Sequence, residues 1–252
     1  MSPSSAFSLA VVCEAAGDLR ICADLADRVL TEEIDWIDPD NLHMYRSWRG
    51  LEETDSHLEW HWVSRLAKQK GLKPHGHFRD EPGDLDARMA RKALLLLLKE
   101  STRVPDAVLL IRDSDGLTER RRGLEQARDS SPWAFPVVLG VAHTKRECWV
   151  LAGFEAQTEA EEKVLAELRR ELGFDPRLNA EDLSAAEAGA LRNAKRVLER
   201  LLQGSPDRER ICWMECEVET LRERGRLSGL SEYLDEVRAR LVPLFSGRPL
   251  QT

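Results

Sequence analysis

Acidic residues follow two short apolar segments of the chain. Glu14 comes directly after residues 8–13 (SLAVVC), and Asp113 and Asp115 come just after residues 106–111 (DAVLLI). Two neighbouring carboxylates repel each other unless a cation lies between them, and Mg²⁺ commonly binds one or two carboxylates together with water and phosphate oxygens. These residues therefore predict a site for a divalent metal, Mg²⁺ or Mn²⁺.

More ordinary roles are open for the same acids. The segment Asp113 to Gly116 (DSDG) is also typical of a turn between a strand and a helix. Asp18, four residues after Glu14, either helps to hold a metal or caps the first helix. Glu147 is either a metal ligand or a solvated acid next to a buried Trp149. The residues alone do not decide between these alternatives.

The pattern of apolar residues predicts an α/β fold. Continuous apolar runs are typical of strands that are buried on both faces, and helical periodicity follows each of them. Repeated strand-helix units predict a mostly parallel sheet flanked by helices, in which ligands collect beyond the carboxyl ends of the strands. The expected strands are residues 8–13, 106–111 and 136–142, with a weaker one at Ile34 to Asp38 (IDWID), and helices are expected near residues 19–30, 58–72 and 85–100.

Charged helices are expected after Gly153. Ser184 and Glu187 have the spacing of a capping box at the start of one of them. This predicts an α/β domain over residues 1–155, with a helical insertion around 40–100, and a helical region over 156–252 whose apolar stripes would suit a homodimer. The four helices expected in that region are residues 159–172, 184–202, 208–224 and 231–241.

Composition limits the classes of function. The 252 residues carry a formal charge of -8, which is the opposite of the basic surface of a stand-alone nucleic-acid-binding protein. Local cations, metal ions or a partner would have to offset that charge on any nucleic acid. The five cysteines are odd in number and lie mainly in apolar stretches, so we expect them reduced and buried. No membrane-spanning run and no secretory signal is recognised, which predicts a cytoplasmic protein.

Basic side chains close to the acidic segments are candidates for contacts with nucleic-acid phosphates. Lys195 (in NAKRVL) lies at the edge of an apolar helix stripe, where it could reach a phosphate or simply extend its stem along the surface. Runs of arginine are also typical of solvated helix faces. The other basic candidates are Arg112, Arg120, Arg121, Arg122 and Lys145.

A glutamate after the first strand, followed by an Asp-x-Asp after a later strand, resembles the acidic signature of TOPRIM domains, which topoisomerases, primases and certain nucleases share. Within that superfamily the chain resembles the OLD-type (overcoming lysogenization defect) nucleases and an allied family of small bacterial TOPRIM-like proteins of unknown function. The resemblance covers residues 11–154 and extends to GFDPRL and NAKRVL in the tail. It implies that Asp18 and Glu147 help to hold a second metal and that Lys195 is the catalytic lysine.

The resemblance implies a Mg²⁺- or Mn²⁺-dependent endonuclease, in which Glu14, Asp113 and Asp115 hold the first metal and DNA is the expected substrate. OLD enzymes carry an ATPase on the same chain, whereas this sequence has no GxxxxGK[ST] motif. A separate ABC- or AAA-type ATPase partner and a role in anti-phage defence are therefore expected. Lys145 stands where the family has a serine. The alternative is a non-catalytic structural or regulatory TOPRIM-like subunit, with the helical tail as its working surface.

Overall fold

The computed structural model describes residues 6–74, 76–78 and 81–247. Its contacts divide the chain into two compact units. The first holds the described residues up to Arg112, Thr118–Gly140 and those from Asp235 onward, and the second holds Asp113–Leu117 and Val141–Leu234. This grouping of contacts does not test the predicted domain boundary at residue 155, which stays a prediction.

A mostly parallel sheet forms the centre of the fold, as the sequence predicted. Its strands lie in the order β2-β1-β6-β7, and β3 also pairs with β1. Strand β1 runs parallel to β2, β3 and β6, with Val12 opposite Leu110 in the pairing of β1 with β6. The bounds are Phe7–Cys13 for β1, Arg46–Arg49 for β2, Leu58–Glu59 for β3, Ala107–Asp113 for β6 and Val137–Ala142 for β7, so the three principal predicted strands are confirmed.

The predicted strand at Ile34 to Asp38 is wrong. Ile34 and Ile37 are both buried, whereas Asp35 and Trp36 between them are exposed. The Ile37 amide donates to the Ile34 carbonyl at 3.0 Å, which closes a turn. Apolar residues three apart cannot share one face of an extended strand, because strand side chains alternate with a period of two.

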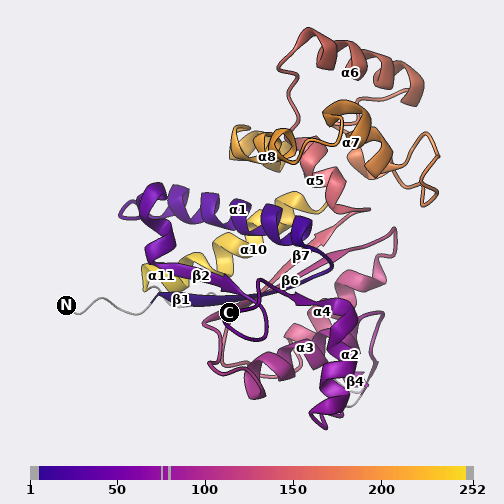
Figure 1. Ribbon diagram of the computed structural model, residues 1–252. Coiled ribbons are helices and arrows are strands. Elements are labelled where there is room, and N and C mark those ends of the chain that lie inside the picture. The colour runs from indigo at the N-terminus through magenta and orange to yellow at the C-terminus, as the bar shows by residue number, and fades with distance from the viewer. Residues whose placement is uncertain (1–5, 75, 79–80, 248–252) are drawn as a thin grey trace. The chain divides into compact units, whose positions relative to one another are not determined.

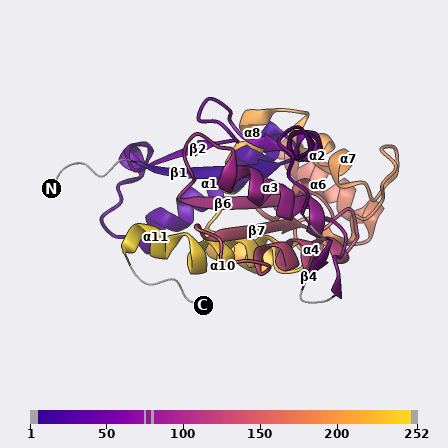
Figure 2. The ribbon, with the colours of Figure 1, turned by 90° about the horizontal axis from the view of Figure 1, so that it is seen from below.

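Helices cover both faces of the sheet in the first unit, with α1 on one face and α3 on the other (Figures 1 and 2). The helices predicted near residues 58–72 and 85–100 are confirmed as α2 and α3, each shorter at its ends. The bounds are Ala16–Glu33 for α1, Trp60–Gln69 for α2, Ala87–Lys99 for α3, Glu119–Arg128 for α4 and Val242–Ser246 for α11, with a 3-10 turn at Pro39–Met44 and a short hairpin of β4 (His77–Phe78) and β5 (Glu81–Pro82).

Helices make up most of the second unit, and its predicted helix at 159–172 is confirmed as α6. The predicted helix 184–202 forms only in its last part, because its N-cap is Asn193 and not Ser184. The Asn193 side chain accepts a hydrogen bond from the Arg196 amide at 3.0 Å. Ser184 instead pairs with Asn193 in an isolated antiparallel bridge. The bounds are Arg146–Ala152 for α5, Glu159–Leu172 for α6, Ala194–Leu202 for α7, Pro206–Met214 for α8 and Val218–Arg224 for α9, and α10 (Leu230–Arg240) follows.

The predicted helix 208–224 is two helices, α8 and α9. Glu215 ends α8, and Glu217, with an extended ψ of 139°, is the N-cap of α9. Cys216 between them is buried. If residues 208–224 formed one straight helix, the apolar residues of its two halves could not all face the interior.

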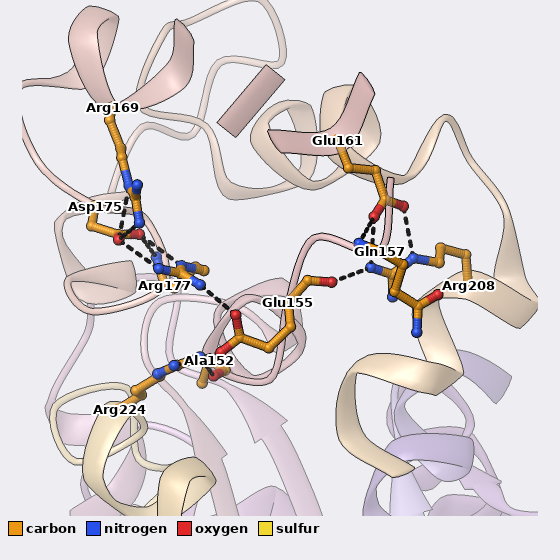
Figure 3. Close-up of polar contacts among 9 residues, drawn as sticks. All are labelled: Ala152, Glu155, Gln157, Glu161, Arg169, Asp175, Arg177, Arg208 and Arg224. Atoms are coloured by element: carbon orange, nitrogen blue, oxygen red, sulfur yellow. Dashed lines mark hydrogen bonds and ion pairs between the residues drawn. The ribbon is translucent and has the colours of Figure 1, made fainter. Parts of the chain in front are cut away.

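An arginine-carboxylate network ties segments of the second unit together (Figure 3). Glu155 pairs with Arg177 at 2.7 Å and also with Arg224, and Arg177 pairs in turn with Asp175 at 3.1 Å. Burial by itself would raise the pKa of Asp175, but the hydrogen bonds from Arg177 and Arg169 outweigh it and hold that pKa below its ordinary value. The network therefore fixes the loop after α6 to the start of the segment that follows α5.

The burial of the cysteines agrees with the prediction made from the sequence. All five are buried and free of disulfides. Burial raises the pKa of Cys148 to about 11 and that of Cys212 to about 12, so both remain thiols at neutral pH. Among the described residues, no helix is both long and apolar enough to cross a bilayer.

The fold predicts a large loss of stability when a buried side chain at the centre of strand β6 is shortened. Leu109 is fully buried at the centre of the strand, so Leu109→Ala should lower the free energy of unfolding by about 2–5 kcal/mol through lost burial and a residual cavity. Leu85, which is 45% exposed, provides the matched control. Leu85→Ala should change the free energy of unfolding by less than about 0.5 kcal/mol. Urea denaturation measures both. Equal losses in the two variants would contradict the central position of β6.

Candidate functional site

Strand β6 changes from apolar to charged at its carboxyl end. Its first five residues are buried, whereas Arg112 and Asp113 at its end are partly exposed. Ser114 turns inward, where it is 3% exposed and its hydroxyl lies 2.9 Å from Nδ1 of His143. Asp115 is exposed. The chain therefore presents two carboxylates on either side of a buried serine.

The turn that the sequence offered as an alternative is present. The Leu117 amide donates to the Ser114 carbonyl at 2.8 Å, and the Asp115 amide donates to the Thr144 carbonyl at 2.9 Å. Asp115 has a φ of 49° and Gly116 a φ of 80°, in the left-handed region that aspartate and glycine tolerate best. Strand β6 therefore ends at Asp113, and the turn that follows it holds Asp115 by backbone hydrogen bonds.

Both carboxylates contact the start of helix α5. Asp113 Oδ1 accepts a hydrogen bond from the backbone amide of Arg146 at 2.8 Å. Asp115 Oδ1 pairs with the Lys145 ammonium, also at 2.8 Å. Helix amides and an ammonium are both donors to negative charge. The structure therefore brings together three of the predicted site residues, Asp113, Asp115 and Lys145.

Lys145 is surrounded by negative charge. The hydrogen bond to Asp115 raises the pKa of Lys145 above its ordinary value, partial burial opposes this, and the charges of Asp115, Asp113 and Glu147 add to the rise. Three carboxylates thus act on a single ammonium, and all three are acids that the sequence predicted as metal ligands.

Glu147 and Lys195 line one pocket of the second unit. It has a volume of about 180 Å³, and Arg146 and Glu209 also line it. Arg146 pairs with Glu209 and lies 3.6 Å from Glu147. Buried Leu198 and Leu202 form its apolar wall. Lys195 is exposed, and both alternatives for its side chain stay open.

In the first unit, Glu14 follows strand β1 and pairs with Arg112 at 2.9 Å. Arg112 also pairs with Asp86 at 3.2 Å and lies 5.5 Å from the centre of the Trp60 ring. Glu14 therefore has a cationic partner on the neighbouring parallel strand.

Asp18 caps helix α1. Its Oδ2 atom accepts hydrogen bonds from the backbone amides of Ala15 at 2.9 Å and of Glu14 at 3.1 Å. These amides have no carbonyl partner within the helix, so the carboxylate stabilises its first turn. The alternative that Asp18 is the N-cap of this helix is wrong, because Ala15 is the N-cap and Asp18 is the third residue of α1, from which its carboxylate reaches back to the Ala15 amide. The metal-binding role of Asp18 stays a prediction.

The three consecutive arginines of α4 each lie near a carboxylate. Arg120 lies 3.7 Å from Asp86, and Arg121 lies 3.6 Å from Glu125 on the same helix. Arg122, whose side chain is 66% exposed, pairs with Asp84 at 3.2 Å. Their positive charge is therefore partly offset, and their contact with nucleic acid stays a prediction.

Three polar residues of these groups were missed from the sequence. Asp86 pairs with Arg112 and lies near Arg120, while Arg146 and Glu209 pair within the pocket of the second unit. Asp86 lies at the start of the segment 85–100 that the sequence predicted as a helix, and the structure makes it the N-cap residue of α3. Arg146 directly precedes Glu147 and could have been found from that neighbour, whereas Glu209 carries no local signal because its partner is 63 residues away.

Comparison with protein-family models, with curated proteins and with solved structures finds no match to this chain. Within the described residues, no group of three or more His, Cys, Asp or Glu side chains is arranged to hold a metal ion. Any function must therefore be inferred from the charged groups themselves.

The pairing of Lys145 with Asp115 predicts a measurable titration shift. Asp115→Asn should lower the pKa of Lys145 because it removes the main acceptor and one negative charge. The midpoint is followed by NMR of lysines labelled at Cε, with Asp207→Asn as the control, since Asp207 is exposed and does not act on Lys145.

The sign of the linked stability follows from the raised pKa. The pair stabilises the fold below the unfolded lysine pKa of about 10.4, and this contribution is lost as the pH rises through the higher folded value. The alkaline loss of stability should therefore be smaller in Asp115→Asn. An unchanged Lys145 midpoint would contradict the pairing.

Proposed function

We propose that the protein is a metal-dependent nuclease that cleaves nucleic-acid phosphodiester bonds. The observation that carries this proposal is that Asp113 and Asp115 both contact the start of α5, where Asp113 accepts from the Arg146 amide at 2.8 Å and Asp115 pairs with Lys145 at 2.8 Å. Carboxylates gathered in this way require positive charge, and a divalent cation would supply more of it than one lysine.

The side chains fit Mg²⁺ or Mn²⁺ in kind. These ions prefer carboxylate oxygens, and Mg²⁺ is usually held by one or two carboxylates while water and phosphate fill its other positions. Asp113 and Asp115 would hold the ion, so a three-carboxylate cluster is not required. A bound ion of this type lowers the pKa of a coordinated water and stabilises charge on the phosphate.

Cationic side chains of the second unit support the same chemistry. Lys195 and Arg146 line the pocket together with Glu147, Glu199 and Glu209, so a phosphate there would need a metal ion as well as these two cations. Lys145 would neutralise Asp115 until a metal replaces it. Each of these roles is electrostatic, which is how phosphodiester cleavage is generally catalysed.

The wider setting rests on the sequence resemblance alone. As a TOPRIM nuclease of the OLD type, the protein would use Glu14 and Asp18 as further metal ligands and Lys195 as the catalytic lysine. Its partner would be a separate ABC- or AAA-type ATPase, its substrate DNA, and its setting anti-phage defence.

The proposal predicts loss of cleavage when either Asp113 or Asp115 is neutralised. Asp113→Asn and Asp115→Asn should each reduce Mn²⁺-dependent cleavage of a plasmid or a labelled oligonucleotide by at least about 100-fold, a loss typical of removing one group that stabilises transition-state charge. EDTA should abolish the activity. Asp35→Asn, at an exposed aspartate outside these groups, should cleave like the wild type.

Variants at Glu14 and Lys195 then test the parts that rest on the resemblance. Equal cleavage by the wild type and by Asp113→Asn would show that the activity belongs to a contaminant. Urea denaturation of each variant separates lost chemistry from lost folding.

A non-catalytic structural or regulatory subunit is the second candidate. The observation that favours it is that Asp18 caps a helix and Glu14 pairs with Arg112, so both acids already stabilise the fold. Under this alternative the pure protein shows no cleavage with Mg²⁺ or Mn²⁺ and forms a stable complex with a partner protein. Cleavage that depends on Asp113 would exclude it.

A further inference from the structure

Helices α2 and α3 form a basic surface on an otherwise acidic chain. Residues 60–74 contain four Lys or Arg residues and no Asp or Glu, and the same is true of α3, although the whole chain carries a charge of -8. The two helices lie side by side in the first unit (Figures 1 and 2). The charge is therefore concentrated on one helix pair.

Contacts between the helices bring the cations of both together. Lys92 of α3 donates to the Ser64 hydroxyl of α2 at 3.0 Å, and Ser64 in turn lies 3.3 Å from the sulfur of Met89. Partial burial lowers the pKa of Lys92, and the nearby positive charge of Arg88 lowers it further. Lys92 therefore links the two helices, and Arg65, next to Ser64 in the chain, is exposed.

The positive charges of this surface are not paired with carboxylates in the way that the arginines of α4 are. Of the part of the chain that the structure describes, no carboxylate forms an ion pair with Arg65, Lys68, Arg88 or Lys92. Arg65, Lys68 and Arg88 are exposed. The neighbouring Lys70 pairs with Glu100 at 3.3 Å. A polyanion could therefore bind these side chains without first breaking an ion pair.

An exposed aromatic ring lies among the cations. Trp62 is 36% exposed, the Arg65 guanidinium lies 3.6 Å from the ring centre, and His61 lies beside it with ring centres 4.2 Å apart. A tryptophan held by an arginine is a platform on which a nucleobase can stack. Phosphates and bases together match this mixture of side chains.

We infer that the α2-α3 surface, defined by Trp62, Arg65, Lys68, Arg88 and Lys92, binds nucleic acid, with phosphates on the cations and an unstacked base on Trp62. A single-stranded segment fits best, because a base must be free to stack. A lipid surface would need several projecting apolar side chains, whereas the exposed residues of α2 beyond Trp62 are polar or charged. The inference deepens the proposed function by naming the surface that holds its substrate.

Fluorescence anisotropy with a labelled 20-nucleotide single strand, measured in EDTA, tests binding without cleavage. The triple variant Arg65→Gln, Lys68→Gln, Arg88→Gln should bind about 100-fold more weakly at 100 mM salt. The slope of log affinity against log salt concentration should become less steep by about two, because each phosphate contact of a single strand contributes roughly 0.7. A control triple variant removes the same charge from exposed cations of the second unit and should bind like the wild type. Its substitutions are Lys163→Gln, Arg170→Gln and Arg226→Gln.

Trp62→Leu tests the stacking separately. It should weaken single-strand binding about 5-fold or more while changing duplex binding little, since a stacked base contributes a factor of at least that size. Thermal unfolding confirms that each variant is folded. The inference is overturned if the wild type does not bind, if the control triple loses as much affinity as the test triple, or if polyglutamate or phosphatidylserine vesicles displace the oligonucleotide at equal charge concentration.

Asp113→Asn separates this inference from the proposed function. It should bind the oligonucleotide in EDTA like the wild type while failing to cleave with Mn²⁺. Binding without cleavage in the wild type would reject the nuclease alone. Mn²⁺-dependent cleavage that is unchanged in the α2-α3 triple variant would reject the surface alone.

Discussion

A strand that is buried on both faces cannot carry a charge until it leaves the core, and this constraint governs where the acids of this protein lie. Residues Leu9 to Cys13 of β1 and Ala107 to Leu110 of β6 have no exposed surface. An unpaired charge within either run would cost several kcal/mol of desolvation. Glu14 and Asp113 therefore stand at the first positions where water, or an oppositely charged group, can stabilise a carboxylate.

Position at a strand end is thus required by solvation and does not by itself indicate catalysis. What the acids contact distinguishes them. Asp18 caps a helix and has a structural role that needs no ligand. Asp113 and Asp115 instead converge on one place, the start of α5, where Asp113 accepts from the Arg146 amide and Asp115 pairs with Lys145. The proposed metal chemistry rests on that difference.

Arginine is used in two different ways in this chain. In the network of Figure 3, Arg177 and its neighbours are paired with carboxylates and hold loops to helices, so their charge is neutralised where it stands. On the α2-α3 surface, no such partner is found for these cations among the residues that the structure describes. Because the net charge of the chain is negative, any attraction for a polyanion must come from a local surface of this second kind.

The sequence by itself determined the principal strands, most helices and the positions of the acids, because burial on two faces and helical periodicity are local patterns. It failed where short segments were decided by their surroundings: Ile34 and Ile37 close a turn, and Asn193 rather than Ser184 begins α7. Only the tertiary structure decided that Lys145 pairs with Asp115 and that Lys195 shares a pocket with Glu147. Such partners lie far apart along the chain, and no local pattern records which distant charge will offset a given one.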